Sequence, residues 1–235
     1  MSIAENIAHI RAQIAEAALS AGRDPQEITL CAATKMNDAA AVREAIRAGV
    51  DCCGENRVQE LTAKLAENAY EGTPVHFIGH LQTNKVRQVV GKVDLIQSVD
   101  SLRLLTAIQT EAARQGITQD ILLEVNIGGE ESKGGFAPDT VRQAVAELSK
   151  FANIRLRGLM AIPPISQNSG DNLKFFQEMY NLSVDITAKN SDNVCVDILS
   201  MGMSDDFADA IRCGSTMIRV GTAIFGPRNY AKPNQ

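Results

Sequence analysis

Lys35 ends an otherwise almost wholly apolar run that begins at Ile28, and this setting changes what its amine can do. Apolar surroundings disfavour the ammonium form, so such a lysine loses its proton more easily and can attack a carbonyl as a free amine. The alternative is a structural lysine that extends its charged end into solvent. Chemistry at Lys35 therefore depends on a carbonyl compound and on the groups that would bind it.

Two short turns far along the chain offer donors for a phosphate group, Met201–Ser204 and Arg219–Thr222. Gly221 and Thr222 would present backbone N–H groups, and Ser204 stands where a helix is expected to begin. The alternative for Ser204 is a plain N-cap, because the two aspartates that follow it are typical of a first helical turn. An amine for an aldehyde and donors for a phosphate together suggest pyridoxal 5'-phosphate (PLP).

Arg219 lies inside the apolar run from Met217 to Phe225, where strand alternation places it on the same face as Gly221. If that face is the interior of a barrel, the guanidinium needs a partner there. One candidate is an acid inside the barrel. The other is the ring nitrogen of a bound ligand, an arrangement that would keep a pyridine unprotonated and make it a poor electron sink.

The composition excludes several classes of partner. The chain has 235 residues, 45% of them hydrophobic and 22% charged, and its net charge is −5. Nucleic acids and anionic membranes are unlikely partners for such a chain, because both require clustered lysine and arginine. No apolar run is long enough to span a bilayer, and Glu5 and Glu16 argue against a transit peptide. We therefore expect a cytoplasmic protein.

The five cysteines indicate a reducing compartment. Cys31 and Cys195 fall in apolar strands, Cys52 and Cys53 are adjacent, and Cys213 follows a helix. There is no CxxC pair, and three histidines are too few and too scattered for a convincing metal site. We therefore expect no metal, and most of these thiols should be small buried apolar groups.

Apolar runs with strand character alternate with amphipathic helical segments along the chain. The expected strands cover residues 28–34, 49–53, 74–79, 94–99, 120–127, 154–162, 194–201 and 217–225. The expected helices cover residues 38–48, 56–69, 83–91, 101–115, 138–150, 171–189 and 204–213, with a further helix in the first 20 residues. Helix starts are marked by Asp38, Ser101, Pro138 and Ser204, and helix ends by Gly49, Gly91, Gly116 and Gly214.

This alternation predicts an α/β fold, a single (β/α)8 TIM barrel with an extra N-terminal helix. A doubly wound open sheet is the alternative, because alternation alone cannot show that the sheet closes. We expect one domain over residues 1–235, with the N-terminal helix at 1–20 and a short tail at 227–235. In a barrel of this kind the site lies at the carboxyl ends of the strands, and the loops after strands 7 and 8 often bind phosphate.

Several separated motifs resemble the family of pyridoxal phosphate homeostasis proteins, which are similar to the barrel domain of fold-type III alanine racemases. The motifs are Ala33-Thr34-Lys35, the segments Gly54–Glu60 and His76–Lys85, and Gly158-Leu159-Met160. The most specific one is the segment Leu199–Gly226. Cys53 departs from the family pattern, in which an aromatic residue is common at that position.

The resemblance implies roles for seven residues and PLP as the cofactor. Lys35 would carry PLP as a Schiff base, and Arg219 would contact the pyridine nitrogen. The phosphate would be bound by Ser204, Gly221 and Thr222, and the cofactor would be lined by Asn56 and Met203. Ser200 and His80 also match the motifs.

A racemase of the two-domain type needs a second acid or base, which the resemblance implies is a tyrosine from a domain after the barrel. The chain ends about ten residues after the eighth expected strand, so we expect that domain to be absent. Tyr70 and Tyr180 fall in helical segments and Tyr230 in the tail. We therefore expect a PLP-binding protein without robust catalysis, acting in intracellular PLP homeostasis and in amino-acid and keto-acid balance.

Two enzymatic alternatives remain open for the same lysine. One is a PLP-dependent amino-acid racemase of the alanine-racemase type. The other is a class I Schiff-base aldolase that uses Lys35 on a sugar phosphate. For the PLP-binding protein, the expected partners are PLP and free amino acids, with apo forms of PLP enzymes as further candidates, and we expect a monomer.

Overall fold

The computed structural model of the protein describes residues 1–130, 133–165, 168, 170–187 and 193–227. All eight expected strands are present near their expected positions. They are β1 (Thr29–Ala33), β2 (Cys52–Glu55), β3 (Val75–Phe77), β4 (Leu95–Val99), β5 (Gln119–Val125), β6 (Ile154–Ala161), β7 (Val194–Ser200) and β8 (Met217–Val220).

Helices connect these strands. The α-helices are α1 (Ile3–Ser20), α2 (Ala39–Arg47), α3 (Val58–Ala66), α4 (Leu102–Gln115), α5 (Pro138–Glu147), α6 (Leu173–Thr187), α7 (Phe207–Arg212) and α8 (Thr222–Phe225). Three 3-10 helices complete the list: η1 (Pro25–Glu27), η2 (Thr83–Gln88) and η3 (Leu148–Lys150).

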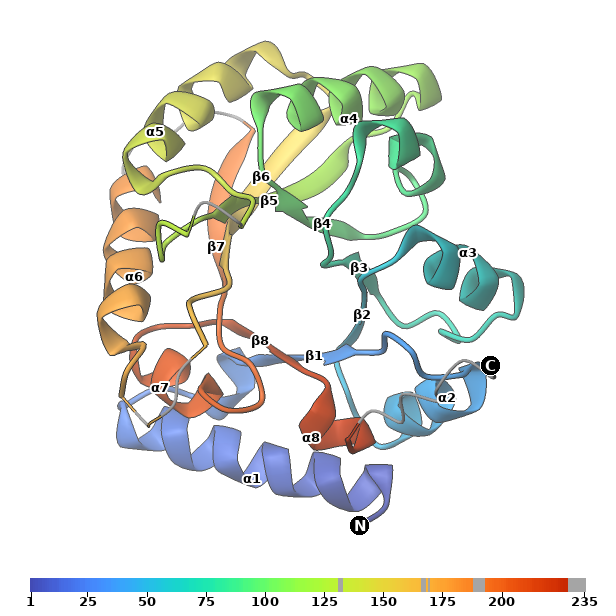
Figure 1. Ribbon diagram of the computed structural model, residues 1–235, viewed down its shortest axis with the longest axis vertical. Helices are drawn as coiled ribbons and strands as arrows, with labels where there is room; N and C mark the ends of the chain where they lie inside the picture. The colour runs from blue at the N-terminus through green and yellow to red at the C-terminus, as the bar shows by residue number, and fades with distance from the viewer. Residues whose placement is uncertain (131–132, 166–167, 169, 188–192, 228–235) are drawn as a thin grey trace, which may run out of the picture.

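The strands close into a parallel barrel in chain order, and β8 pairs with β1 (Figure 1). The closing register joins Leu30 to Ile218 and Cys31 to Arg219. The expected TIM barrel is therefore confirmed, and the open-sheet alternative is wrong. The ring of helices in Figure 1 surrounds this barrel, as parallel strands joined by helical crossovers require.

Strand alternation divides the apolar residues into two cores. Along β1, Leu30 and Ala32 belong to the large core between strands and helices, whereas Cys31 belongs to a small cluster on the opposite face, inside the barrel. We call this second group the inner cluster. Its buried members are Cys31, Cys52, Leu95, Leu122, Met160 and Met217.

Local capping explains where several helices begin and end. Ser2 and Glu5 form the expected capping box of α1, with Glu5 N donating to Ser2 Oγ at 3.2 Å and Ser2 N donating to Glu5 Oε2 at 2.7 Å. Asp38 and Ser101 cap α2 and α4 through their side chains. Gly116 ends α4 in the left-handed conformation, at a φ of 68°.

The extra N-terminal helix packs against the end of the chain. Its buried stripe contains Ile7, Ile10 and Ile14, and it contacts α7 and α8, beside which it runs in Figure 1. Asn6 Nδ2 donates to the carbonyl oxygen of Ile224 at 2.8 Å. Helix α1 thus covers the barrel beside α8, which has only 4 residues.

Three expected elements differ from the structure. The strand expected over 217–225 ends at Val220, because Gly221 has a φ of −119° and a ψ of −75°, which turns the chain into α8. Ser204 does not begin α7, since the helix starts at Phe207 and Asp206 occupies the N-cap position. The segment expected as a helix at 83–91 is the 3-10 helix η2.

In the part of the chain that the structure describes, no helix has both the length and the apolar character required to cross a membrane. The tail expected at 227–235 lies outside the described residues except for Pro227.

Gly158 allows β6 and β7 to approach each other, and this predicts a steric requirement for glycine. Its φ is 149°, and a Cβ there would lie 1.7 Å from the carbonyl oxygen of Ile198. We expect Gly158→Ala to lower the free energy of unfolding by about 3 kcal/mol or more, measured by urea denaturation.

Gly116→Ala is the comparison variant, because its φ of 68° is also positive and strains an alanine, but nothing lies within 4 Å of the added Cβ. This variant should lower the free energy of unfolding by about 1–2 kcal/mol, because only backbone strain is added. Equal losses in the two variants would contradict the steric explanation.

Candidate functional site

The seven residues assigned to the cofactor from the sequence line one cavity at the carboxyl ends of the strands. The cavity has a volume of about 420 Å³. The seven are Lys35, Asn56, Met203, Ser204, Arg219, Gly221 and Thr222. Ala33, Ile78 and Ile162 add an apolar part to the lining. A mainly preformed pocket with a few convergent polar groups is the usual form of a small-molecule site.

Lys35 lies in a tight turn just after β1 rather than within the strand. Asn37 N donates to Thr34 O at 3.1 Å, and Asn37 Nδ2 donates to Lys35 O at 3.0 Å. The next residue, Met36, has a φ of 63°, an uncommon conformation for a residue other than glycine. The backbone on both sides of Lys35 is therefore fixed by an unusual turn.

A buried ion pair behind β2 holds the start of this turn. Lys64 Nζ lies 2.5 Å from Glu55 Oε1 and also donates to the carbonyl oxygen of Thr34 at 2.8 Å. The Thr34 hydroxyl donates to the same carboxylate oxygen of Glu55. The Glu55 and Lys64 side chains are 0% and 7% exposed, so this pair is shielded from water. Burial and the Glu55 carboxylate raise the pKa of the Tyr70 hydroxyl, which also donates to Glu55.

Glu60 holds the other side of the turn. Met36 N donates to Glu60 Oε2 at 2.6 Å. Glu55 and Glu60 belong to the motif Gly54–Glu60, but no role for either residue, or for Lys64, was predicted from the sequence. Glu55 is a charged residue at a buried strand position, where a carboxylate requires a partner, but the strand expected over 49–53 ended before it.

Asn56 follows β2 and contributes an unusual oxygen to the site. Its Oδ1 atom is buried and has no hydrogen-bond partner among the residues that the structure describes. An unpaired buried amide oxygen costs free energy, so its position on the cavity wall points to a donor supplied by a ligand.

Arg219 projects from β8 into the barrel interior, as the alternation predicted. It is 5% exposed, and its Nη1 donates to Ser200 Oγ at 2.6 Å while its Nη2 donates to Ala161 O at 2.9 Å. Burial lowers the pKa of the Arg219 guanidinium. Among the described residues the guanidinium forms no ion pair within 4.0 Å, although the Glu124 and Asp206 carboxylates are near enough to counteract part of this lowering of its pKa. Ser200 instead orients Arg219 from below the cavity.

The groups proposed for a phosphate gather where α8 begins. Gly221 is the N-cap of α8, and Ala223 N points to Ser204 Oγ at 3.5 Å. A Cβ on Gly221 would lie 3.4 Å from the Ala33 carbonyl oxygen, so the two strand ends are closely packed here. The first N–H groups of a helix have no partner within it and suit an anion.

The acidic residues next to Ser204 differ in their orientation. Asp206 is occupied, since its Oδ1 accepts from Met203 N at 2.8 Å and its Oδ2 accepts from Asn172 Nδ2 at 2.8 Å. Asp205 is exposed and lines the cavity. The Asp206 carboxylate therefore has a structural role, and only the Asp205 carboxylate lines the cavity.

His80 does not reach this cavity. Its side chain is 70% exposed, and its Nδ1 lies 3.2 Å from Asp100 Oδ2. Both residues line a separate depression at the same end of the barrel. The structure thus brings the seven assigned residues together with Ser200 behind them and leaves His80 apart.

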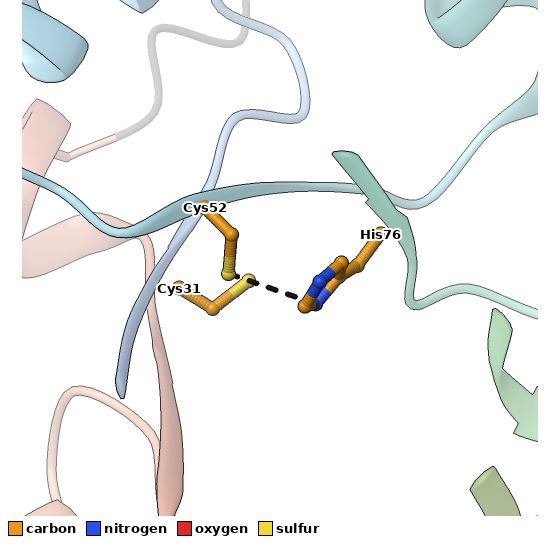
Figure 2. Close-up of side chains that lie close together, drawn as sticks. All are labelled: Cys31, Cys52 and His76. Carbon is orange, nitrogen blue, oxygen red and sulfur yellow. Dashed lines mark hydrogen bonds between the residues drawn. The ribbon is translucent and has the colours of Figure 1, made fainter. Parts of the chain in front are cut away.

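The barrel interior beneath the cavity contains a histidine and two thiols that the sequence analysis did not connect. Cys31, Cys52 and His76 point toward one another, as Figure 2 shows. A hydrogen bond from the Cys52 thiol lowers the pKa of Cys31 to about 6, helped by the nearby His76 and Arg219.

The expectation of buried thiols is confirmed for Cys31, Cys52 and Cys53. It is wrong for Cys195, which is exposed, and Cys213 is only half-buried. The first half of β7, where Cys195 lies, alternates between intermediate and exposed residues rather than being covered on both faces.

Comparison with known proteins agrees with this geometry. The chain matches the family model described as alanine racemase, N-terminal domain, over residues 3–229. The pyridoxal phosphate homeostasis protein of Pseudomonas aeruginosa is 41% identical over 232 residues, which cover 99% of this chain and 98% of that protein.

Two solved structures are similar over almost the whole chain. A protein of unknown function from Bifidobacterium adolescentis has a TM-score of 0.90 and 38% identity, covering 95% of this chain and 94% of that one. PipY of Synechococcus elongatus, solved with PLP bound, has a TM-score of 0.82 and 33% identity, covering 96% of this chain and 100% of that one. The matched residues include every strand of the barrel. The chain therefore belongs to the family of pyridoxal phosphate homeostasis proteins.

Proposed function

We propose that this protein binds PLP at Lys35 and serves in the storage and delivery of the cofactor, without robust catalysis of its own. The observation that carries the proposal is the convergence of Lys35, Arg219 and the Ser204–Thr222 donors on one cavity of about 420 Å³. PipY, a relative solved with PLP bound, supports the same cofactor. Through this role the protein would contribute to amino-acid and keto-acid balance.

The residues of the cavity suit the chemical parts of PLP. An amine, a donor for a ring nitrogen and donors for a phosphate are all present on its wall. The unpaired Asn56 Oδ1 is a further sign that the cavity is shaped for a ligand with its own donors or a bound water. When bound, PLP supplies an aldehyde that reacts reversibly with primary amines, with loss of water.

Each residue then has a defined task. Lys35 supplies the amine. Glu60 and the Glu55–Lys64 pair hold the turn and so fix the backbone position of Lys35. Arg219 donates hydrogen bonds but cannot accept them, so a pyridine nitrogen facing it would act as the acceptor and stay unprotonated. Ser204 and the start of α8 would bind the phosphate.

Weak catalysis follows from two features. An unprotonated ring nitrogen stabilises a carbanion poorly. A racemase also needs a second acid or base, and neither described candidate tyrosine lines the cavity, since Tyr70 donates to Glu55 and Tyr180 lies on α6 beside Gly214. Tyr230 lies outside the described residues.

We further propose free amino acids and apo forms of PLP enzymes as exchange partners, a cytoplasmic location and a monomeric state. Five cysteines without a disulfide are compatible with a reducing compartment. Light scattering tests the monomer. Racemisation assays with D- and L-amino acids test the enzymatic alternative, and robust turnover would contradict a storage role.

Lys35→Ala should abolish the visible absorption of bound PLP while the protein still folds, because Lys35 lies in a turn outside the strands. The measurement is an absorption spectrum before and after borohydride, with mass spectrometry to place the reduced cofactor on the Lys35 peptide. Lys92→Ala, which changes an exposed lysine elsewhere, is the control and should keep the spectrum. An unaltered spectrum in Lys35→Ala would overturn the assignment.

Arg219→Gln should shift the absorption of bound PLP and raise its dissociation constant by about tenfold or more, because a hydrogen bond from a charged donor is lost. The spectrum and an equilibrium titration measure both effects. Arg142→Gln changes an arginine that pairs with Asp185 on the surface and should behave like the unmodified protein. If the two variants bind PLP alike, Arg219 does not contact the ring.

Glu60→Ala should weaken PLP retention by about tenfold, because the Lys35 turn loses the acceptor for Met36 N. Glu60→Gln keeps an acceptor oxygen and should largely restore retention. The dissociation constant of PLP is the measurement. Equal retention in the alanine variant and the unmodified protein would show that the turn does not depend on Glu60.

A further inference from the structure

We propose that Cys31, Cys52 and His76 form a zinc-binding site inside the barrel, beneath the PLP cavity and independent of it. The three side chains come from adjacent strands, β1, β2 and β3. Cys31 and Cys52 are register partners, and His76 pairs with Gly54, two residues further along β2. One potential ligand atom from each residue lies within 4.8 Å of the other two (Figure 2).

The distances suit a tetrahedral zinc ion. Cys52 Sγ lies 3.6 Å from His76 Nδ1. Zinc bonds of about 2.3 Å to sulfur and about 2.0–2.1 Å to nitrogen, at a tetrahedral angle, place those two ligand atoms about 3.6 Å apart. The thiol and the imidazole are therefore already at the separation that a shared zinc ion requires.

A chain of hydrogen bonds fixes the protonation of His76. Arg219 can only donate, so Ser200 Oγ accepts from it at 2.6 Å and donates its own proton to Gln97 Oε1 at 2.7 Å. The amide nitrogen of Gln97 then faces His76 Nδ1 at 2.9 Å and donates to it.

Because Nδ1 accepts this bond, it is the unprotonated nitrogen, and zinc would replace Gln97 as the partner of its lone pair. This neutral form is the one that binds metals. Gln97 would then give up its hydrogen bond to His76 and keep the contact from its Nε2 to Met217 Sδ at 3.1 Å.

The charge of the cluster suits its surroundings. Two thiolates neutralise a divalent ion, and the remaining members of the inner cluster are Leu95, Leu122, Met160 and Met217. A neutral group costs far less to bury among such residues than an isolated ion. Cysteine and histidine are the ligands that zinc prefers, and with three of them the fourth position is left to a small ligand.

The ligands are 0%, 2% and 7% exposed for Cys31, Cys52 and His76 respectively. Zinc would therefore enter while the chain folds and would then resist removal. The competing explanation is that the two thiols are small apolar groups joined by S–H hydrogen bonds, and it predicts no bound metal.

The test is the zinc content of the full-length, tag-free protein from cells grown with added zinc, after dialysis against a chelator. We expect about one zinc ion per chain, as a single site of three protein ligands would hold. The double variant Cys31→Ser, Cys52→Ser should lose most of it. The double variant Cys195→Ser, Cys213→Ser changes two cysteines outside the barrel interior and should keep it.

X-ray absorption at the zinc edge tests the unmodified protein directly, so the result does not depend on how the variants fold. The expected fit has sulfur neighbours at about 2.3 Å and nitrogen at about 2.0–2.1 Å. Each of three results would overturn the proposal. The unmodified protein could contain no zinc, the Cys31→Ser, Cys52→Ser variant could retain zinc, or the zinc could have no sulfur neighbour. Lys35→Ala should keep its zinc, which separates this proposal from that of PLP binding.

Discussion

In a closed barrel, successive residues of a strand face the helices and the interior in turn. The residues that face the helices therefore determine which residues face the interior. The organisation of this protein depends on that constraint. On β8, Ile218 and Val220 belong to the outer core, and this requires the intervening Arg219 to point inward. On β2, the same rule places Glu55 outside against α3 and Asn56 on the cavity wall. A slip of one residue would exchange these roles and leave two charged groups unpartnered.

The outward face of β2 stabilises the position of Lys35 although it does not line the cavity. The Glu55–Lys64 pair is buried, and removing one partner of such a pair typically costs about 3–5 kcal/mol because the other charge is left in the interior. That energetic penalty favours conformations in which Thr34 stays in contact with both residues. The neighbouring turn, with Met36 in a left-handed conformation, is thereby kept in a shape that its own sequence would not favour.

The periodicity of the chain was sufficient to predict the barrel and the position of most strands and helices. It also pointed to Lys35, which ends an apolar run, and to Arg219 and Gly221, because a charged or small residue within an apolar run stands out. It could not find the groups that act from another strand or helix, such as Glu60, whose contact with Met36 depends on how α3 is placed. The grouping of Cys31 and Cys52 with His76 was missed for the same reason. Only the register of β1, β2 and β3 brings these three side chains together.

The errors had physical causes as well. Residues 217–225 form one apolar run, and the turn at Gly221 within it leaves no signal in hydrophobic periodicity. Ser204 and Asp206 both favour the N-cap position, and the structure places Asp206 there, although its side chain makes no capping hydrogen bond to α7. Cys195 sits in an apolar segment of β7 whose first half is only partly buried among the residues that the structure describes.

The contact between Asn6 and Ile224 joins residues 218 positions apart in the chain. Helix α1 is therefore among the last elements of the barrel to find its place, because α7 and α8 must be synthesised before it can dock on them. Until then its isoleucine stripe stays exposed to water and to other chains. The same separation raises the entropic cost of the final docking step, so barrel closure should be a late event of folding. Helices α1 and α8 are thus far apart in the order of synthesis but adjacent in the fold, and the phosphate end of the cavity is completed only once α8 has been synthesised.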